Sequence, residues 1–236
     1  WLTPIVETFK SYPDTSIIQP KILDFKKKDY FEYAGAGGGF IDKYGYPYCR
    51  GRIFDTIEKD HGQYNDTTSI FWASGACLFI RSTVFRTLNG FDEVFFAHME
   101  EIDLCWRSWN LNYNCTYVGH STIYHVGGAT LNNTNPKKTY LNFRNNLFML
   151  VKNAPGNLCL LVFIRLVLDG IAGVKFMLSI KPKHCIAIIN SHFSFYRHLS
   201  RLLKQRKTLQ QKSNYFTEKS IIWSYFIKNK KLFKNL

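Results

Sequence analysis

The sequence predicts an α/β fold over about the first 155 residues and a helical extension over residues 156–236. Short apolar runs alternate with amphipathic helical patterns as far as residue 150, an order typical of a sheet covered by helices. No strand pattern follows. The 236 residues are 46% hydrophobic and 17% aromatic, which is enough to build a buried core.

The individual elements follow from turn residues and periodicity. Glycine, proline and asparagine mark the turns, and apolar spacings of three and four residues mark the helices. Gly75 interrupts one apolar run, where a ligand or backbone segment can approach closely. The expected helices cover residues 5–12, 83–88, 100–112, 138–154, 157–180 and 195–212; the expected strands cover residues 16–18, 69–73, 76–80, 115–119 and 122–128, with a turn at Gly119 and His120.

Positive charge gathers in the C-terminal part. Residues 181–236 hold 13 lysines or arginines and one acid, Glu218, whereas the preceding 180 residues are nearly neutral. Such a basic segment favours an anionic partner, either a lipid surface or nucleic acid. Residues 157–180 are apolar but contain Arg165, Asp169 and Lys175, which favours an interfacial helix over a membrane span.

Cysteine usage indicates a reducing compartment. The six cysteines form no C-x-x-C pair, and most lie in apolar runs that favour buried thiols. We therefore expect a cytoplasmic protein.

Residues 95–107, "FFAHMEEIDLCWR", place three carboxylates among aromatic side chains. Acids at a helix N-terminus are favourable in themselves, so capping is one interpretation. Adjacent Glu100 and Glu101 repel each other, however, and an apolar setting raises a carboxyl pKa toward the range of a general base. Asp103 and Arg107 are spaced to pair along the helix.

Three further features have both a structural and a functional interpretation. His125, at the end of a strand, is either structural or a metal ligand. Arg144 and Asn145 lie on a helix, where they form a solvated face or bind a phosphate. The glycine-rich stretch 34–47, "AGAGGGFIDKYGYP", lacks the Lys-Ser/Thr ending of a phosphate-binding loop, so it favours a flexible loop.

Four motifs in order, "SGACLFIR", "NGFDEVFFAHMEEIDLCWR", "TIYHVGG" and "YLNFRNNL", resemble the second half of family 2 glycosyltransferases, in particular bacterial rhamnosyltransferase-like enzymes. The resemblance covers about residues 1–155. It implies part of the GT-A fold, an inverting transfer from a nucleotide-sugar donor to a lipid-linked or polysaccharide acceptor, and a role in surface-glycan synthesis at the inner face of the plasma membrane.

The resemblance also implies roles for individual residues. Glu101 takes the place of the catalytic base, with Glu100 and Asp103 in the same motif. His125 matches a histidine that joins the family's Asp-x-Asp in holding Mg²⁺ or Mn²⁺. The expected substrate-binding residues are Trp72, Gly75, Ala76, Arg144 and Asn145.

One departure from the family is plain. The sequence contains no Asp-x-Asp, so we expect it to begin inside the domain. Two alternatives stay open: a non-catalytic remnant or scaffold, and nucleic-acid binding through the basic tail. In the second case bases would stack on the tail's aromatic side chains, although no nucleic-acid module is recognised. These aromatics are Tyr215, Phe216, Trp223, Tyr225 and Phe226.

Overall fold

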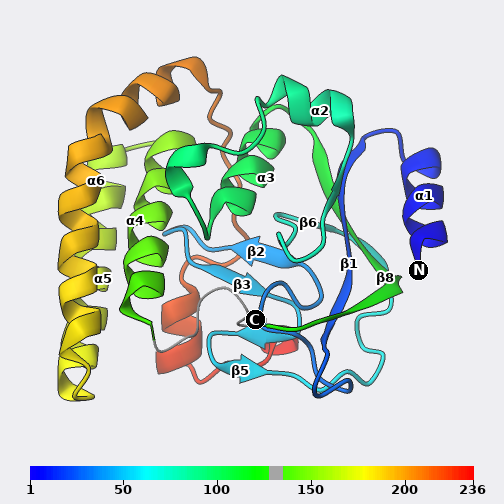
Figure 1. Ribbon diagram of the computed structural model, residues 1–236, viewed down its shortest axis with the longest axis horizontal. Helices are drawn as coiled ribbons and strands as arrows, with labels where there is room; N and C mark the ends of the chain where they lie inside the picture. The colour runs from blue at the N-terminus through cyan, green and yellow to red at the C-terminus, as the bar shows by residue number, and fades with distance from the viewer. Residues whose placement is uncertain (128–134) are drawn as a thin grey trace.

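The computed structural model describes residues 1–127 and 135–236, and it confirms the α/β class (Figure 1). A mixed four-stranded sheet has the strand order β6-β8-β1-β7, and a smaller antiparallel sheet has the order β2-β3-β4-β5. Helices α4, α5 and α6 form a layer along one side of the molecule, and α1 lies at the opposite side.

The mixed sheet is built on β1 (Thr15–Asp24) and β8 (Asn114–His125), which run parallel. β6 (Thr67–Ile70) pairs antiparallel with β8, and β7 (Phe79–Ile80) pairs antiparallel with β1. β1 is buried along almost its whole length, as expected for a central strand covered on both faces.

The two strands expected at residues 115–119 and 122–128 are one strand, β8, so the predicted turn at Gly119 and His120 is wrong. The register against β1 shifts there, because Pro20 pairs with Val118 and Lys21 pairs with Thr122. The Gly119 N–H donates to Asp66 O at 3.0 Å, and the chain at residues 64–66 packs directly against this glycine. Glycine therefore permits a close backbone approach and a bulge. Gly128, the last residue of the predicted second strand, lies outside the described residues.

The apolar run around Gly75 also differs from the prediction. β6 and β7 lie on opposite edges of the mixed sheet, so residues 71–78 cross from one edge to the other. Two contacts anchor the crossing segment. Trp72 forms an isolated antiparallel β-bridge with Gly39, and the Ser74 N–H donates to the buried Gln19 Oε1 at 2.7 Å. Contacts with residues distant in the chain therefore determine the course of this segment. The local pattern instead predicts two consecutive strands interrupted only at Gly75.

Part of the glycine-rich stretch is ordered as sheet instead of a flexible loop. β2 (Gly39–Ile41) pairs with β3 (Pro47–Cys49), followed by β4 (Arg52–Ile53) and β5 (Thr56–Ile57). A side chain at position 39 would overlap the Trp72 ring, so glycine lets the indole pack flat on the strand. The glycines here serve close packing.

The helices of the first part lie near their expected positions. They are α1 (Leu2–Ser11), α2 (Ser82–Thr87), the short 3₁₀ helix η1 (Glu93–Phe95), α3 (Glu100–Asn110) and α4 (Pro136–Asn153). α4 begins with a cap, since the Asn135 side chain accepts from the Lys137 N–H at 2.9 Å and Pro136 occupies the first turn.

The C-terminal part is helical, as predicted, but it does not stay apart from the sheets. α5 (Leu158–Leu178) and α6 (Pro182–Thr208) pack against α4, and residues 209–236 then return to the small sheet with η2 (Trp223–Ile227) and η3 (Phe233–Asn235) (Figure 1). Tyr215, Ile221 and Tyr225 are buried there. Within the described ranges, no helix has the length and apolar character needed to cross a bilayer.

Substitution of Gly119 tests the strand bulge. We expect Gly119→Ala to lower the free energy of unfolding by about 1–3 kcal/mol, since the new methyl group would lie 2.5 Å from the Tyr64 carbonyl oxygen. Gly170→Ala is the matched control. It lies exposed inside α5 with open space around it, so it should stabilise by about 0.5–1 kcal/mol. Urea unfolding measures both, and equal effects would contradict the bulge.

Candidate active site

The candidate site lies where α3 begins, after a loop with unusual backbone angles. Phe96, His98 and Met99 have positive φ values of 65°, 69° and 71°, a region that non-glycine residues rarely adopt. Each such residue costs on the order of 1–3 kcal/mol and persists only where surrounding contacts enforce it. The loop determines where Glu100 and Glu101 enter the helix.

Arg144 and Asn145 of α4 supply those contacts. The buried Asn145 amide donates to the carbonyl oxygens of Phe95 at 2.9 Å, Ala97 at 2.9 Å and His98 at 2.7 Å. The Arg144 guanidinium donates to Phe95 O at 3.0 Å and to Asn145 Oδ1 at 2.8 Å. Both side chains hold the loop before α3, while their substrate binding stays a prediction.

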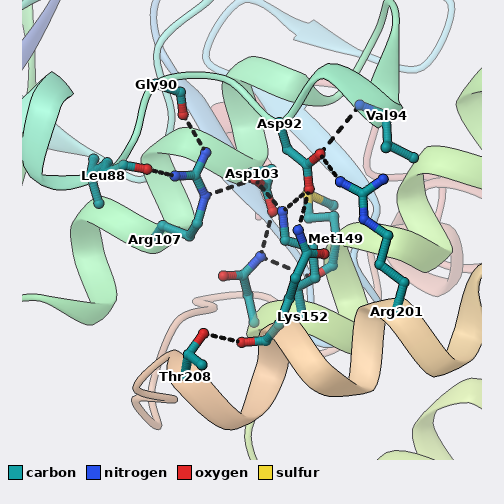
Figure 2. Close-up of polar contacts among 12 residues, drawn as sticks. Leu88, Gly90, Asp92, Val94, Asp103, Arg107, Met149, Lys152, Arg201 and Thr208 are labelled. Carbon is teal, nitrogen blue, oxygen red and sulfur yellow. Dashed lines mark hydrogen bonds and ion pairs between the residues drawn. The ribbon is translucent and has the colours of Figure 1, made fainter.

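Asp103 is the centre of a buried ionic network behind this loop (Figure 2). Its carboxylate has no exposed area, and it accepts from Arg107 Nε at 2.8 Å and Lys152 Nζ at 2.9 Å. Asn153 Nδ2 donates to the other oxygen at 2.9 Å. The predicted pairing with Arg107 is confirmed, and the complete burial of Asp103 favours a positioning role for it.

The same network reaches the C-terminal helix through Asp92. Lys152 Nζ lies 2.9 Å from Asp92 Oδ2, and α6 adds Arg201 and Gln205 to this carboxylate at 3.3 and 3.0 Å (Figure 2). Burial is the largest single influence and raises the pKa of Asp92, but the Lys152 ammonium together with the hydrogen bonds from Gln205 and the Val94 N–H outweighs it, so the pKa lies below its ordinary value. α6 is therefore tied to the segment that leads into α3.

Glu101 is the outstanding titratable group of the site. Its Oε2 is buried with no hydrogen-bond partner among the described residues, and Glu100 Oε2 is in the same condition. Burial, aided by repulsion from Glu100, raises the pKa of Glu101 to about 7. The backbone N–H groups of Gly75 and of the helix start favour the ionised form but do not cancel these causes. Such a carboxyl changes its charge near neutral pH.

Of the residues expected at the donor pocket, the structure brings Gly75 to Glu101. Gly75 is exposed, and a Cβ built on it would lie 3.8 Å from Glu101 Cβ. Ala76 follows, its N–H donating to Ser74 Oγ at 3.1 Å. Trp72 lies in the core instead, 3% exposed, with its indole N–H donating to Phe40 O at 2.8 Å.

His125 lies at the end of β8 beside a carboxylate that the sequence motifs do not include. Its Nδ1 is 3.3 Å from Glu32 Oε2, a close contact without hydrogen-bond alignment. Glu32 also lies against Gly127, where any side chain would collide with it. Among the described residues, no group of three or more His, Cys, Asp or Glu side chains is placed to hold a metal ion. His125 and Glu32 thus do not form a metal site by themselves.

The sequence motifs do not include Arg52 or Glu32, which act with Glu101 on the electrostatic environment of Cys49. Arg52 is buried, donates to Tyr33 O at 3.1 Å and lies 3.2 Å from Cys49 Sγ. Burial raises the pKa of the Cys49 thiol, and the nearby Glu32 and Glu101 carboxylates add to this shift. Arg52 and Cys49 lie in the small sheet, where no sequence motif or periodicity distinguishes them.

No protein-family model matches the chain. Two curated relatives, the N-acetylglucosaminyl-diphospho-decaprenol L-rhamnosyltransferases of Mycobacterium tuberculosis strains CDC 1551 / Oshkosh and ATCC 25618 / H37Rv, are each 37% identical to it over 54 residues. This segment is 23% of the chain and 18% of each relative, so the chain matches less than a fifth of their length. The similarity supports a glycosyltransferase role in general.

Removal of the central lysine tests the ionic network. We expect Lys152→Met to lower the free energy of unfolding by about 3–5 kcal/mol, because Asp92 and Asp103 would stay buried without their shared cation. Arg201→Met is the control, since Arg201 is half exposed and should cost at most about 1 kcal/mol. Denaturant unfolding at pH 7 measures both, and a mild effect of Lys152→Met would contradict the network's importance.

Glu101 should make stability depend on pH. Because its pKa is raised in the folded state, the folded protein holds the proton more tightly, and stability falls as pH rises from about 4.5 to 7. Glu101→Gln should therefore stabilise at pH 8 by on the order of 1–3 kcal/mol and have little effect at pH 4.5. Melting temperatures of both proteins across this range measure the difference, which a pH-independent gain would contradict.

Proposed function

We propose that this chain forms the acceptor-side part of an inverting family 2 glycosyltransferase, with Glu101 as the general base. One observation carries the proposal: at a helix start beside exposed Gly75 lies a carboxyl group with a pKa of about 7 and a buried oxygen that has no hydrogen-bond partner within residues 1–127 and 135–236. A carboxyl group whose pKa lies near 7 can accept a proton at neutral pH, which suits it to base catalysis. The rhamnosyltransferase similarity supports the reaction class.

The proposed step joins proton transfer to displacement at the sugar. The acceptor hydroxyl oxygen bonds to the anomeric carbon, the bond from that carbon to the nucleotide diphosphate breaks, and the hydroxyl proton moves to Glu101. Attacking and leaving oxygens lie on opposite faces of the sugar, which inverts the anomeric centre. Glu100 then keeps the pKa of the base high, and Asp103 positions the helix that carries it.

The proposed substrates follow the relatives' names. We propose a nucleotide-activated sugar, with L-rhamnose as the first donor to assay, and a sugar–diphosphate–polyprenol acceptor. An acceptor of this kind would bring the enzyme to the inner face of the plasma membrane, in surface-glycan synthesis. Neither Arg144 nor Asn145 is required to touch substrate, since both hold the loop before Glu100.

The family resemblance is the reason that a divalent cation, Mg²⁺ or Mn²⁺, is included in the proposal. His125 and Glu32 supply two possible donors, which is fewer than such ions take in proteins. Further oxygen donors would have to join them, so no step of the transfer is assigned to a metal.

Replacement of the base tests the function in the full-length protein. Glu101→Gln should lower kcat by about 10²–10⁴-fold, the usual contribution of a general base. Wild-type kcat/KM should rise with pH and level off above about 7, because only the ionised carboxylate accepts the proton. Transfer of labelled L-rhamnose from its nucleotide to a polyprenyl acceptor is the assay.

Glu100→Gln is the matched control, since it removes the neighbouring charge and keeps the base. Its kcat should change less than tenfold, and its pH profile should shift to lower pH as repulsion disappears. Near wild-type turnover by Glu101→Gln would remove Glu101 as the base.

A further inference from the structure

A continuous apolar stripe runs along the outer face of α5. Its members recur at spacings of three and four residues, which places them on one side of the helix. The opposite side carries Leu161, Arg165, Asp169 and Gly173, which are buried against the protein. The exposed stripe consists of Leu160, Phe163, Val167, Ile171, Val174 and Leu178.

α6 lies beside α5 (Figure 1). It carries a similar apolar stripe. Its first half exposes Ile186, Ile189 and Phe193, opposite the buried residues Ile188 and Phe195. Toward its C-terminal end the same face turns basic and lines a groove of about 890 Å³, with Leu203, Lys204 and Lys207 among the lining residues. An apolar face that ends in positive charge is typical of a helix lying in a lipid interface.

Among the large hydrophobic side chains of the described residues, the two with the highest fractional exposure lie where α5 ends and turns toward α6. Leu178 is 81% exposed and Ile180 is 89% exposed. Ile180 also has a φ of 57°, a conformation that is strained for a β-branched side chain and easy for glycine or asparagine. Neither folding nor solubility favours an isoleucine there, so its side chain is explained best by contact with something outside the chain.

Charge identifies the kind of partner. Lys181 and Lys183 lie exposed at the turn, and the only carboxylate in residues 157–208 is Asp169, which is buried against Arg165. The outer face of the hairpin thus combines apolar side chains with positive charge and has no exposed acid. That combination matches the interface of an anionic bilayer, whose headgroups are negative above an apolar interior.

The terminal basic segment is placed differently. Residues 209–236 fold back over the small sheet, where Tyr215 and Tyr225 are buried and Tyr215 Oη donates to Lys43 O at 2.6 Å. We propose that the α5–α6 hairpin, and not this terminal segment, docks the protein on an anionic membrane surface, with Leu178 and Ile180 entering the bilayer. The proposal goes beyond the transfer reaction and does not depend on it.

Vesicle flotation of the 236-residue chain tests the docking. Vesicles of phosphatidylcholine with phosphatidylglycerol should bind the chain, and vesicles of phosphatidylcholine alone should bind it far less. Leu178→Asn and Ile180→Asn should each weaken binding about tenfold, from the loss of one buried aliphatic side chain. Lys181→Gln and Lys183→Gln should each weaken binding to anionic vesicles about fivefold.

Two readouts separate docking from damage to the fold. Ile180→Asn should melt no lower than the wild type, because asparagine tolerates the positive φ. Val6→Asn, which removes another exposed apolar side chain on α1 at the opposite side of the molecule, should leave binding unchanged. Glu101→Gln should bind vesicles normally whether or not it transfers sugar.

Two results would overturn the proposal. One is equal binding by the hairpin variants and the wild type. The other is no binding to either kind of vesicle; if sedimentation equilibrium then shows a dimer that Ile180→Asn dissociates, this face is assigned to a second copy of the chain.

Discussion

The shared cation Lys152, held between Asp92 and Asp103, is the constraint on which the candidate site depends. All three side chains are almost fully buried, so each charge relies on its partners for the stabilisation that water would otherwise provide. The three residues come from the segment before η1, from α3 and from α4. One lysine therefore determines how the helix that carries Glu101 lies against the helical layer.

The site combines stabilising and destabilising features in close proximity. In the part of the chain that the structure describes, one buried oxygen of Glu101 has no hydrogen-bond partner, and the preceding loop has three residues with positive φ. Asn145 and the Asp103 network offset these costs through charge-assisted and amide hydrogen bonds. Functional sites commonly carry such local strain, which neighbouring contacts must support. α6 joins this support through Arg201 and Gln205, so the extension is part of the site's framework.

Local patterns predicted α3, α4 and the Asp103–Arg107 pair, because these depend on residues within one or two helical turns. The errors concern segments whose structure depends on distant partners. β8 stays one strand because Gly119 has no side chain and so leaves room for the chain at residues 64–66. Arg52 is positioned by the folding of the small sheet and Glu32 by the hydrogen bond from its backbone N–H to Ile22 O of β1, and no local signal distinguishes them from other charged residues.

The sequence by itself determined the α/β class, the helical extension and the concentration of positive charge, since composition and periodicity are local properties. Through its motif the sequence also predicts Glu101, among three acids, as the base. Only the tertiary structure decided that Asp103 is sealed inside an ionic network, that Trp72 lies in the core, and that the apolar surface of the extension gathers on the α5–α6 hairpin. Burial decides each of these, and burial depends on residues that are distant in the chain.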